Sequence, residues 1–403
     1  MLVSGPNVTS YVPKGNWSNN FTGVSVVNVE GSSITPTLIL TPSPVNSCAS
    51  NSVTGTTVCT ANNTDVYLLN GTTLSNTLTS GAGNSFIHFS GGFCTNCGVT
   101  MDAIHNKAVI GLSVGPTDPM TGFGAPGYQF LDLPPVSVGF APGAVSSPTP
   151  TPVFEKPPVV SPAGMISEGI LIDPIHNLLL SAAENGNYEI SNVSTIPPSL
   201  NSSTAAFFEN VTEGGELDSS AEDCSTGIAL APAEQFAQSA SSVFITNLPQ
   251  APIMSSPWTT PSQNNQILSE SILANGADGI AVAQGTHIGI VSGENGGNAV
   301  TAIVLPTTAG PVPPKVIDWV TCNVGGNFIN GADPHTVTAY QSPSSGDAIA
   351  LLANQGATSL AVVDLTKMLN ITTVRRTVDG HACALGTLPL DMPDMVVRFI
   401  SVP

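Results

Sequence analysis

A short pattern recurs along this chain: a polar residue, then glycine, then an alternating run of apolar residues. Copies begin at Cys97, Glu168, Thr226 and Asp278, and a further copy begins at His335 with threonine in place of glycine. The starting positions of successive copies are between 52 and 71 residues apart. Self-similarity at a spacing of this order indicates a repeat architecture, in which each repeat is one unit that packs on the next.

A second pattern sets the number of repeats. It is an alternating strand that ends in aspartate, asparagine or another turn residue, and such strands pack apolar side chains on a sheet face. The copies lie at residues 24–29, 65–71, 128–133, 188–193, 243–248, 299–304 and 360–365. Short strands at this spacing are typical of propeller blades. The sequence therefore predicts an all-β fold, a single closed β-propeller over residues 1–403, with seven blades favoured and six or eight left open.

Two turns between predicted strands are nearly identical, at residues 102–106 and 173–177. Aspartate and asparagine side chains cap such turns, and proline fixes the backbone at the second. Strands follow at 108–114 and 178–182, and residues 348–353 are predicted to be the same strand in the last repeat. His105 and His176 occupy the same turn position, so we expect them at the rim of the blades.

The repeat pattern is interrupted and then closed. Residues 134–162 are rich in proline, which cannot pair inside a sheet, and they are predicted to form an inserted surface strap. Polar insertions are predicted at 199–223 and 255–266. Because closing a ring removes sheet edges, the C-terminal strand at 395–402 is expected to complete the blade that begins near Val24.

Charge excludes two classes of partner. Only 9% of residues are charged, and 8 basic against 27 acidic residues give a net charge of −19. Nucleic acids and anionic membrane surfaces both attract clustered lysine and arginine, which this chain lacks. No apolar run reaches the ~18 residues that span a bilayer, so membrane insertion is not expected. The composition favours an extracellular or cell-surface protein.

The seven cysteines point to structural disulfides in an oxidising compartment. Cys48 and Cys59 flank a polar stretch, and Cys94 and Cys97 form a CxxC; a zinc ribbon would need a second such pair. The odd count leaves one thiol unpaired or bonded to another chain. Candidate glycosylation sequons support the extracellular assignment weakly: Asn7, Asn16, Asn20, Asn62, Asn70, Asn192, Asn201, Asn210 and Asn370.

Chemistry is expected where the inner strands of the blades begin. The residue before each glycine would lie at one mouth of a central channel, and Asp223 and Asp333 lie close to that ring in sequence. Oxygen ligands favour Ca²⁺ over Zn²⁺. The candidate calcium ligands are Glu168, Asp278, Thr226 and Asp333, with His335 as the base of an ester or lactone hydrolysis. The alternative is that these are ordinary solvated channel residues.

The pattern resembles secreted propeller families of the YVTN and lactonase-like type, through its glycine-led inner strands and Asp-Pro-x-x-Asn turns. Residues 223–229 through 332–340 also look like a group of secreted bacterial proteins without assigned function, and the likeness covers about the last two-thirds of the chain. The lactonase-like families use acidic and amide ligands in the channel. Glu168 and Asp278 match that use, whereas Thr226 and Cys97 depart from it.

Two functions follow from these observations. The first is an extracellular binding or assembly module without its own catalysis, which takes a protein or glycan partner or self-associates as a surface layer or filament. Missing nucleophile and nucleotide motifs, sparse charge and the proline-rich insertion favour it. The alternative is the Ca²⁺-dependent hydrolase of the channel mouth.

Overall fold

The computed structural model has an all-β fold divided into two compact units. The first unit holds strands β1 to β17 and the second holds β18 to β29. No helix of the described residues is long and apolar enough to cross a membrane. The structure describes residues 2–4, 9–14, 23–29, 37–39, 45–51, 53–54, 56–61, 65–70, 85–88, 98–112, 127–133, 153–154, 159–160, 167–183, 188–193, 205–208, 217, 219–233, 241–248, 267–272, 277–293, 299–307, 318–323, 336–353, 359–367, 369 and 396–401.

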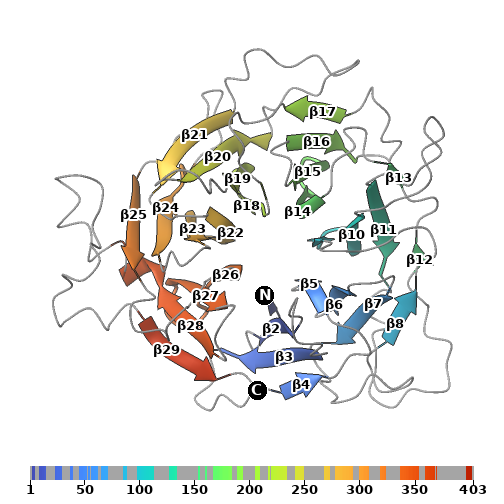
Figure 1. The fold of residues 1–403 in the computed structure, drawn as a ribbon, viewed down its shortest axis with the longest axis horizontal. Coiled ribbons are helices and arrows are strands. Elements are labelled where there is room, and N and C mark those ends of the chain that lie inside the picture. Colours follow the sequence, from blue (N-terminus) through green and yellow to red (C-terminus); the bar gives the residue numbers. More distant parts are fainter. Residues whose placement is uncertain are drawn as a thin grey trace. The chain divides into compact units, whose positions relative to one another are not determined.

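The first unit contains four antiparallel sheets, each built from consecutive strands of the chain (Figure 1). In the first sheet the order is β1 (Leu2–Ser4), β2 (Thr9–Lys14), β3 (Gly23–Asn28) and β4 (Thr37–Ile39). In the second it is β5 (Val45–Ser50), β6 (Thr56–Ala61), β7 (Asp65–Asn70) and β8 (Ser85–His88). The third has β9 (Val99–Asp102), β10 (Lys107–Leu112) and β11 (Gly127–Asp132), with β12 (Val153–Phe154) and β13 (Val159–Val160) both pairing with β11. The fourth has β14 (Ser167–Asp173), β15 (Leu178–Ala183), β16 (Tyr188–Asn192) and β17 (Ala205–Phe208).

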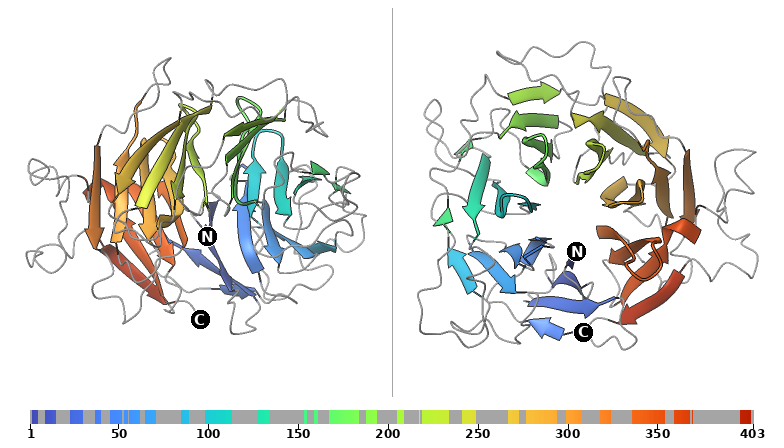
Figure 2. Two further views of the ribbon diagram at one scale, coloured as in Figure 1. Left: turned by 45° about the horizontal axis from the view of Figure 1, so that its top comes forward. Right: turned by 180° about the vertical axis from the view of Figure 1, so that it is seen from behind.

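The second unit contains three four-stranded sheets with the same consecutive order, which Figure 2 shows from two further directions. The fifth sheet has β18 (Ala221–Asp223), β19 (Ile228–Ala233), β20 (Ser241–Asn247) and β21 (Ile267–Ile272). The sixth has β22 (Ala277–Ala283), β23 (Ile288–Gly293), β24 (Ala299–Val304) and β25 (Asp318–Asn323). The seventh has β26 (Thr336–Gln341), β27 (Ala348–Ala353), β28 (Ser359–Asp364) and β29 (Val396–Ser401).

The predicted strand that sets the repeat count is confirmed in every sheet. Its copies are the third strands, β3, β7, β11, β16, β20, β24 and β28, each paired antiparallel with the second strand of its sheet. The described residues thus form seven sheets of one consecutive design. The strand predicted at 348–353 is also confirmed, since β27 is the second strand of its sheet.

Strands β10 and β11 of the third sheet are buried on both faces, which explains their nearly continuous apolar runs. Alternate side chains of β10 point to opposite faces. Val109 packs in a cluster with the fourth sheet, whereas its neighbour Ile110 packs in a cluster with the second sheet. On β11, Phe130 and Leu131 divide in the same way. The second and third sheets are therefore each held by one core on either face, and consecutive sheets of the first unit share these cores.

One copy of the glycine-led pattern belongs to a different strand from the one predicted. Thr226 and Gly227 were expected to start an innermost strand, but Gly227 has φ 70° and lies in the turn that precedes β19, the second strand. The first strand of this sheet is β18, which ends at Asp223. The error arises because a polar residue and glycine mark both the start of a first strand and the end of the hairpin turn. The other copies are first strands, β9, β14, β22 and β26.

Two predictions about the outer strands are corrected. The C-terminal strand was expected to complete the sheet near Val24, but β29 pairs with β28 and is the fourth strand of its own sheet, while β3 pairs with β2 and β4. The proline-rich strap at 134–162 is not wholly outside the sheets, because β12 and β13 lie within it and pair with β11. Its segments at 153–154 and 159–160 pair where valine and phenylalanine interrupt the prolines.

Candidate functional site

The turns between first and second strands carry most of the polar contacts of the described residues. In the third sheet, Asp102 closes the turn: its Oδ1 accepts the backbone N–H groups of Ile104 (3.0 Å) and His105 (2.8 Å). Its Oδ2 lies 2.7 Å from Nδ1 of His105. Asn106 then takes a left-handed φ of 55°, which asparagine tolerates better than most residues. The sequence DAIHN thus encodes both the turn and an aspartate–histidine pair.

The fourth sheet repeats this turn with nearly the same geometry. Asp173 Oδ1 accepts from the backbone N–H groups of Ile175 (2.9 Å) and His176 (3.0 Å), and Oδ2 lies 2.5 Å from His176 Nδ1. The aspartate side chain is 1% exposed and the imidazole 35%. Asn177 has φ 56°. The predicted similarity of the two turns is therefore confirmed, and both histidines lie at exposed turn positions.

In the second unit the aspartate–histidine pair joins two sheets. Asp223 Oδ1 accepts from the backbone and hydroxyl of Ser225, while Oδ2 lies 2.5 Å from Nδ1 of His287 in the turn of the sixth sheet. His287 takes the left-handed φ of 57° that Asn106 has in its own turn. Gln284 adds two contacts to the fifth sheet, accepting from the Cys224 backbone N–H at 3.0 Å and donating to the Glu222 carbonyl.

These pairs position histidine but do not by themselves make a catalytic centre. An ionised carboxylate only accepts hydrogen bonds, so the contact places the proton of a neutral imidazole on Nδ1 and leaves Nε2 as the lone-pair nitrogen. A metal centre would need further ligands, and the described residues contain no group of three or more His, Cys, Asp or Glu side chains that could hold an ion. The contacts show that these aspartate side chains cap and stabilise the turns.

Thr226 lies apart from Asp278, although both were predicted to bind the same calcium ion. Thr226 lies in the turn after β18, and the contacts of Gln284 place that turn beside the end of β22. Asp278 lies near the start of β22, where its carbonyl accepts from Ser219. The five steps along the strand from Asp278 to Ala283 span roughly 16 Å. Thr226 and Asp278 therefore lie at opposite ends of this strand and do not share an ion.

The other members of the ring are not brought together by the described residues. Glu168 lies near the start of β14 in the first unit, and its side chain is outside the described part of the structure. Cys97, Asp333 and His335 lie outside the described residues. Glu168 and Asp278 each precede the glycine of a first strand, as predicted. That Glu168 and Asp278 bind calcium, and that His335 acts as a base, are still predictions.

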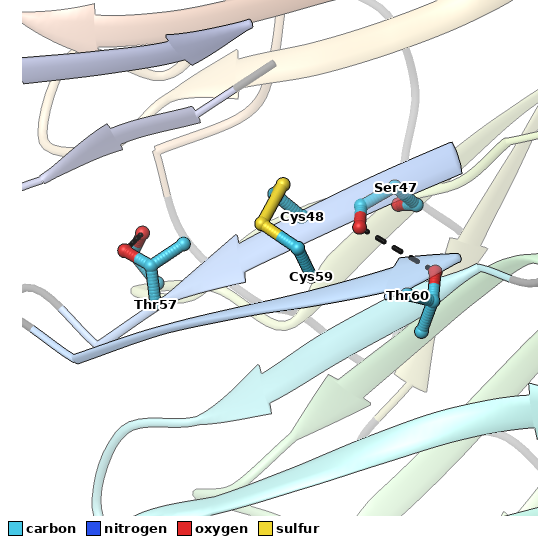
Figure 3. Close-up of a disulfide and its surroundings, with 6 residues drawn as sticks. Ser47, Cys48, Thr57, Cys59 and Thr60 are labelled. Atoms are coloured by element: carbon cyan, nitrogen blue, oxygen red, sulfur yellow. Dashed lines mark hydrogen bonds between the residues drawn. A yellow bond between two sulfur atoms is a disulfide. The ribbon is translucent and has the colours of Figure 1, made fainter. Parts of the chain in front are cut away.

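The disulfide between Cys48 and Cys59 is confirmed. The two cysteines face each other across paired strands β5 and β6, with their Cα atoms 4.1 Å apart (Figure 3). The bond staples a hairpin rather than a loop, and both residues are buried in the core between the first and second sheets. Thr60 Oγ1 donates to the Ser47 carbonyl beside it. Cys94 and Cys97 lie outside the described residues.

Sequence reasoning missed an apolar feature of the same turns. Val53, Ile104 and Ile175 are 78%, 62% and 54% exposed, and they are the exposed large hydrophobic residues of the described chain. Each is the third residue of the turn between the first and second strands, in the second, third and fourth sheets. We call these three side chains the apolar row. The signal was present in the near-identical DAIHN and DPIHN turns, since an isoleucine recurs where a turn normally has a polar residue.

No protein-family model matches the sequence, and no curated protein sequence is significantly similar to it. Among solved structures, the chain is similar to Chaetomium thermophilum Sqt1, solved bound to the N-terminus of the ribosomal protein L10. That match has 14% identity and a TM-score of 0.52, covering 89% of this chain and 82% of that chain. A second match is the β-propeller domain of Myceliophteria thermophila Cps50 (Swd1), with 12% identity, a TM-score of 0.48, and coverage of 88% of this chain and 92% of that one.

The seven sheets of consecutive strands, together with the likeness to Sqt1, define the class of fold as a β-propeller. Identity of 14% carries no information about activity.

Proposed function

We propose that this chain is a single closed propeller of seven blades that acts outside the cell as a protein-binding module without its own catalysis. The observation that carries the proposal is the apolar row. Hydrophobic residues scattered singly over a surface need no explanation, whereas exposed apolar patches mark interaction sites. Here three consecutive sheets expose a valine or isoleucine at the same turn position.

Further observations support the binding function. The Sqt1 structure, a β-propeller neighbour, contains a bound protein segment, so the fold supports this use in that protein. A second copy of this chain is a poor partner, because two bodies of net charge −19 repel each other. A protein partner is therefore favoured over self-association into a filament. Valine and isoleucine offer no hydrogen-bonding groups to a glycan.

The extracellular setting and the closed ring rest on separate features. The disulfide between Cys48 and Cys59 supports an oxidising compartment, where such bonds persist. Seven sheets of one design support closure, because an unclosed array would leave sheet faces such as those of the first and seventh sheets without a neighbour. Kinship with the secreted YVTN and lactonase-like group is part of this proposal.

The function is tested by isolating complexes from the protein's own extracellular surroundings. Purified protein is incubated with those secreted proteins, cross-linked, and separated by size-exclusion chromatography with light scattering. We expect a complex of fixed stoichiometry. Protein that remains monomeric, but hydrolyses esters or lactones only when Ca²⁺ is present, would contradict the binding function and favour the hydrolase.

A further inference from the structure

The apolar row differs from the matching positions of the second unit. There the third turn residues are Ser225, Gly285 and Ser344, which are exposed but polar or small. The contrast shows that the turn itself does not require an apolar residue. Gly285 has a left-handed φ of 86°, which disfavours other residues, but the two serine turns show that this position does not demand an apolar side chain.

The apolar row is held in a fixed backbone. Val53 donates its N–H to Asn51 Oδ1 (2.9 Å), as Ile104 does to Asp102 and Ile175 to Asp173. Neighbouring turns are also joined, because Asn51 Nδ2 donates to the Ala103 carbonyl (3.3 Å) and to Asn106 Oδ1 (3.0 Å). Binding to a fixed surface loses little conformational entropy. The N–H groups are already used, so a partner meets these residues through their side chains.

The spacing of the sheets limits the shape of the partner. Sheets that pack face to face lie about 10 Å apart, so side chains at matching positions of consecutive sheets repeat at about that distance. A polyproline II helix has three residues per turn and rises about 3.1 Å per residue, so every third side chain lies on one face about 9 Å from the next. An extended segment with an apolar residue at every third position therefore matches the apolar row.

The net charge of this chain indicates which residues of the partner lie between its apolar ones. The chain carries 27 acidic and 8 basic residues, and its potential attracts cations and repels a second copy of itself. Within the turns, Asp102 and Asp173 are buried and paired with histidine, so the surface beside the apolar row presents imidazoles rather than carboxylates. Attraction of a basic segment is thus long-range, and the local contact is apolar.

Resting on the proposed binding function, we propose that the apolar row binds an extended, cationic segment of another protein. The segment adopts a polyproline II conformation and places apolar side chains at every third position against Ile175, Ile104 and Val53.

The test uses a fluorescein-labelled peptide of three Leu-Pro-Lys repeats and measures fluorescence anisotropy. The peptide should bind, and two matched peptides should not: one with serine for leucine, and one with glutamate for lysine. The variant Ile104→Ser/Ile175→Ser should bind at least about tenfold more weakly, since a few buried contacts carry most of the binding energy of an interface. Ser344→Ala, at the matching turn of the second unit, should bind as the parent does.

Several results would overturn the proposal. They are no binding of the leucine peptide, equal binding of the serine peptide, or equal binding by the double variant. The peptide controls keep the test valid even if the double variant fails to fold, which its thermal midpoint would show. If a native complex forms equally well with the double variant, the binding function stands and the apolar row is not its site. If no complex with a native protein forms at all, the proposed function itself fails.

Discussion

The aspartate of the DPIHN turn offers the sharpest test of how these turns are held. Asp173→Ala removes the acceptors of three hydrogen bonds from a carboxylate that is 1% exposed. The two backbone bonds act as a cap, and loss of such a cap costs about 1 to 2 kcal/mol. The pair with the partly exposed His176 adds about 1 kcal/mol, because solvent screens it. We therefore expect a loss of about 2 to 3 kcal/mol in the free energy of unfolding.

Asp173→Asn separates the two contributions. Asparagine keeps one oxygen to accept the backbone N–H groups but loses the charge that faces His176. It should cost about 1 kcal/mol, half the cost of alanine or less. Urea unfolding followed by circular dichroism measures both variants, and a cycle with His176→Ala isolates the pair. Equal effects of asparagine and alanine, or no coupling in the cycle, would refute this account of the turn.

Three further predictions concern the rest of the described structure. Replacing Cys48 and Cys59 by alanine opens a bridge of sequence separation 11 and should lower unfolding stability by about 3 kcal/mol, measured in urea without reductant. A Cβ on Gly289 would lie 2.9 Å from Leu230 Cδ1, so Gly289→Ala should cost about 1 to 2 kcal/mol. Combined with Leu230→Ala its cost should be smaller, and strict additivity of the two would argue against the clash. His287→Ala removes the partner of a buried carboxylate in the preceding sheet and should lower the free energy of unfolding, measured in urea, by about 2 kcal/mol; an unchanged value would count against the pair.

Much of the fold could be predicted because third strands have a simple signature. Their apolar residues alternate between two cores, as Phe130 and Leu131 do, and they end at a turn residue. This pattern depends on local geometry, so a single sequence reveals it. First strands were harder to place, because β18 is a short strand with a glutamate and an aspartate, whereas the apolar run after Gly227 is more conspicuous.

The candidate site was less predictable because its contacts join distant residues. Asp223 and His287 are 64 residues apart, and nothing in either neighbourhood indicates the other. The pairs at Asp102 and Asp173 are local and recur as a visible motif. The exposure of Ile104 and Ile175 could not be read from the sequence, since apolar residues near strands are usually buried.

Burial on both faces has a consequence for how this chain can change over time. Val109 and Ile110 are neighbours in sequence, yet each depends on a different adjoining sheet. A substitution at one should be compensated by a residue of the adjoining sheet rather than by its chain neighbour. Covariation among homologues should therefore connect positions one repeat apart more strongly than positions side by side. A single sheet transplanted into another repeat protein would need matching surfaces from both of its former neighbours.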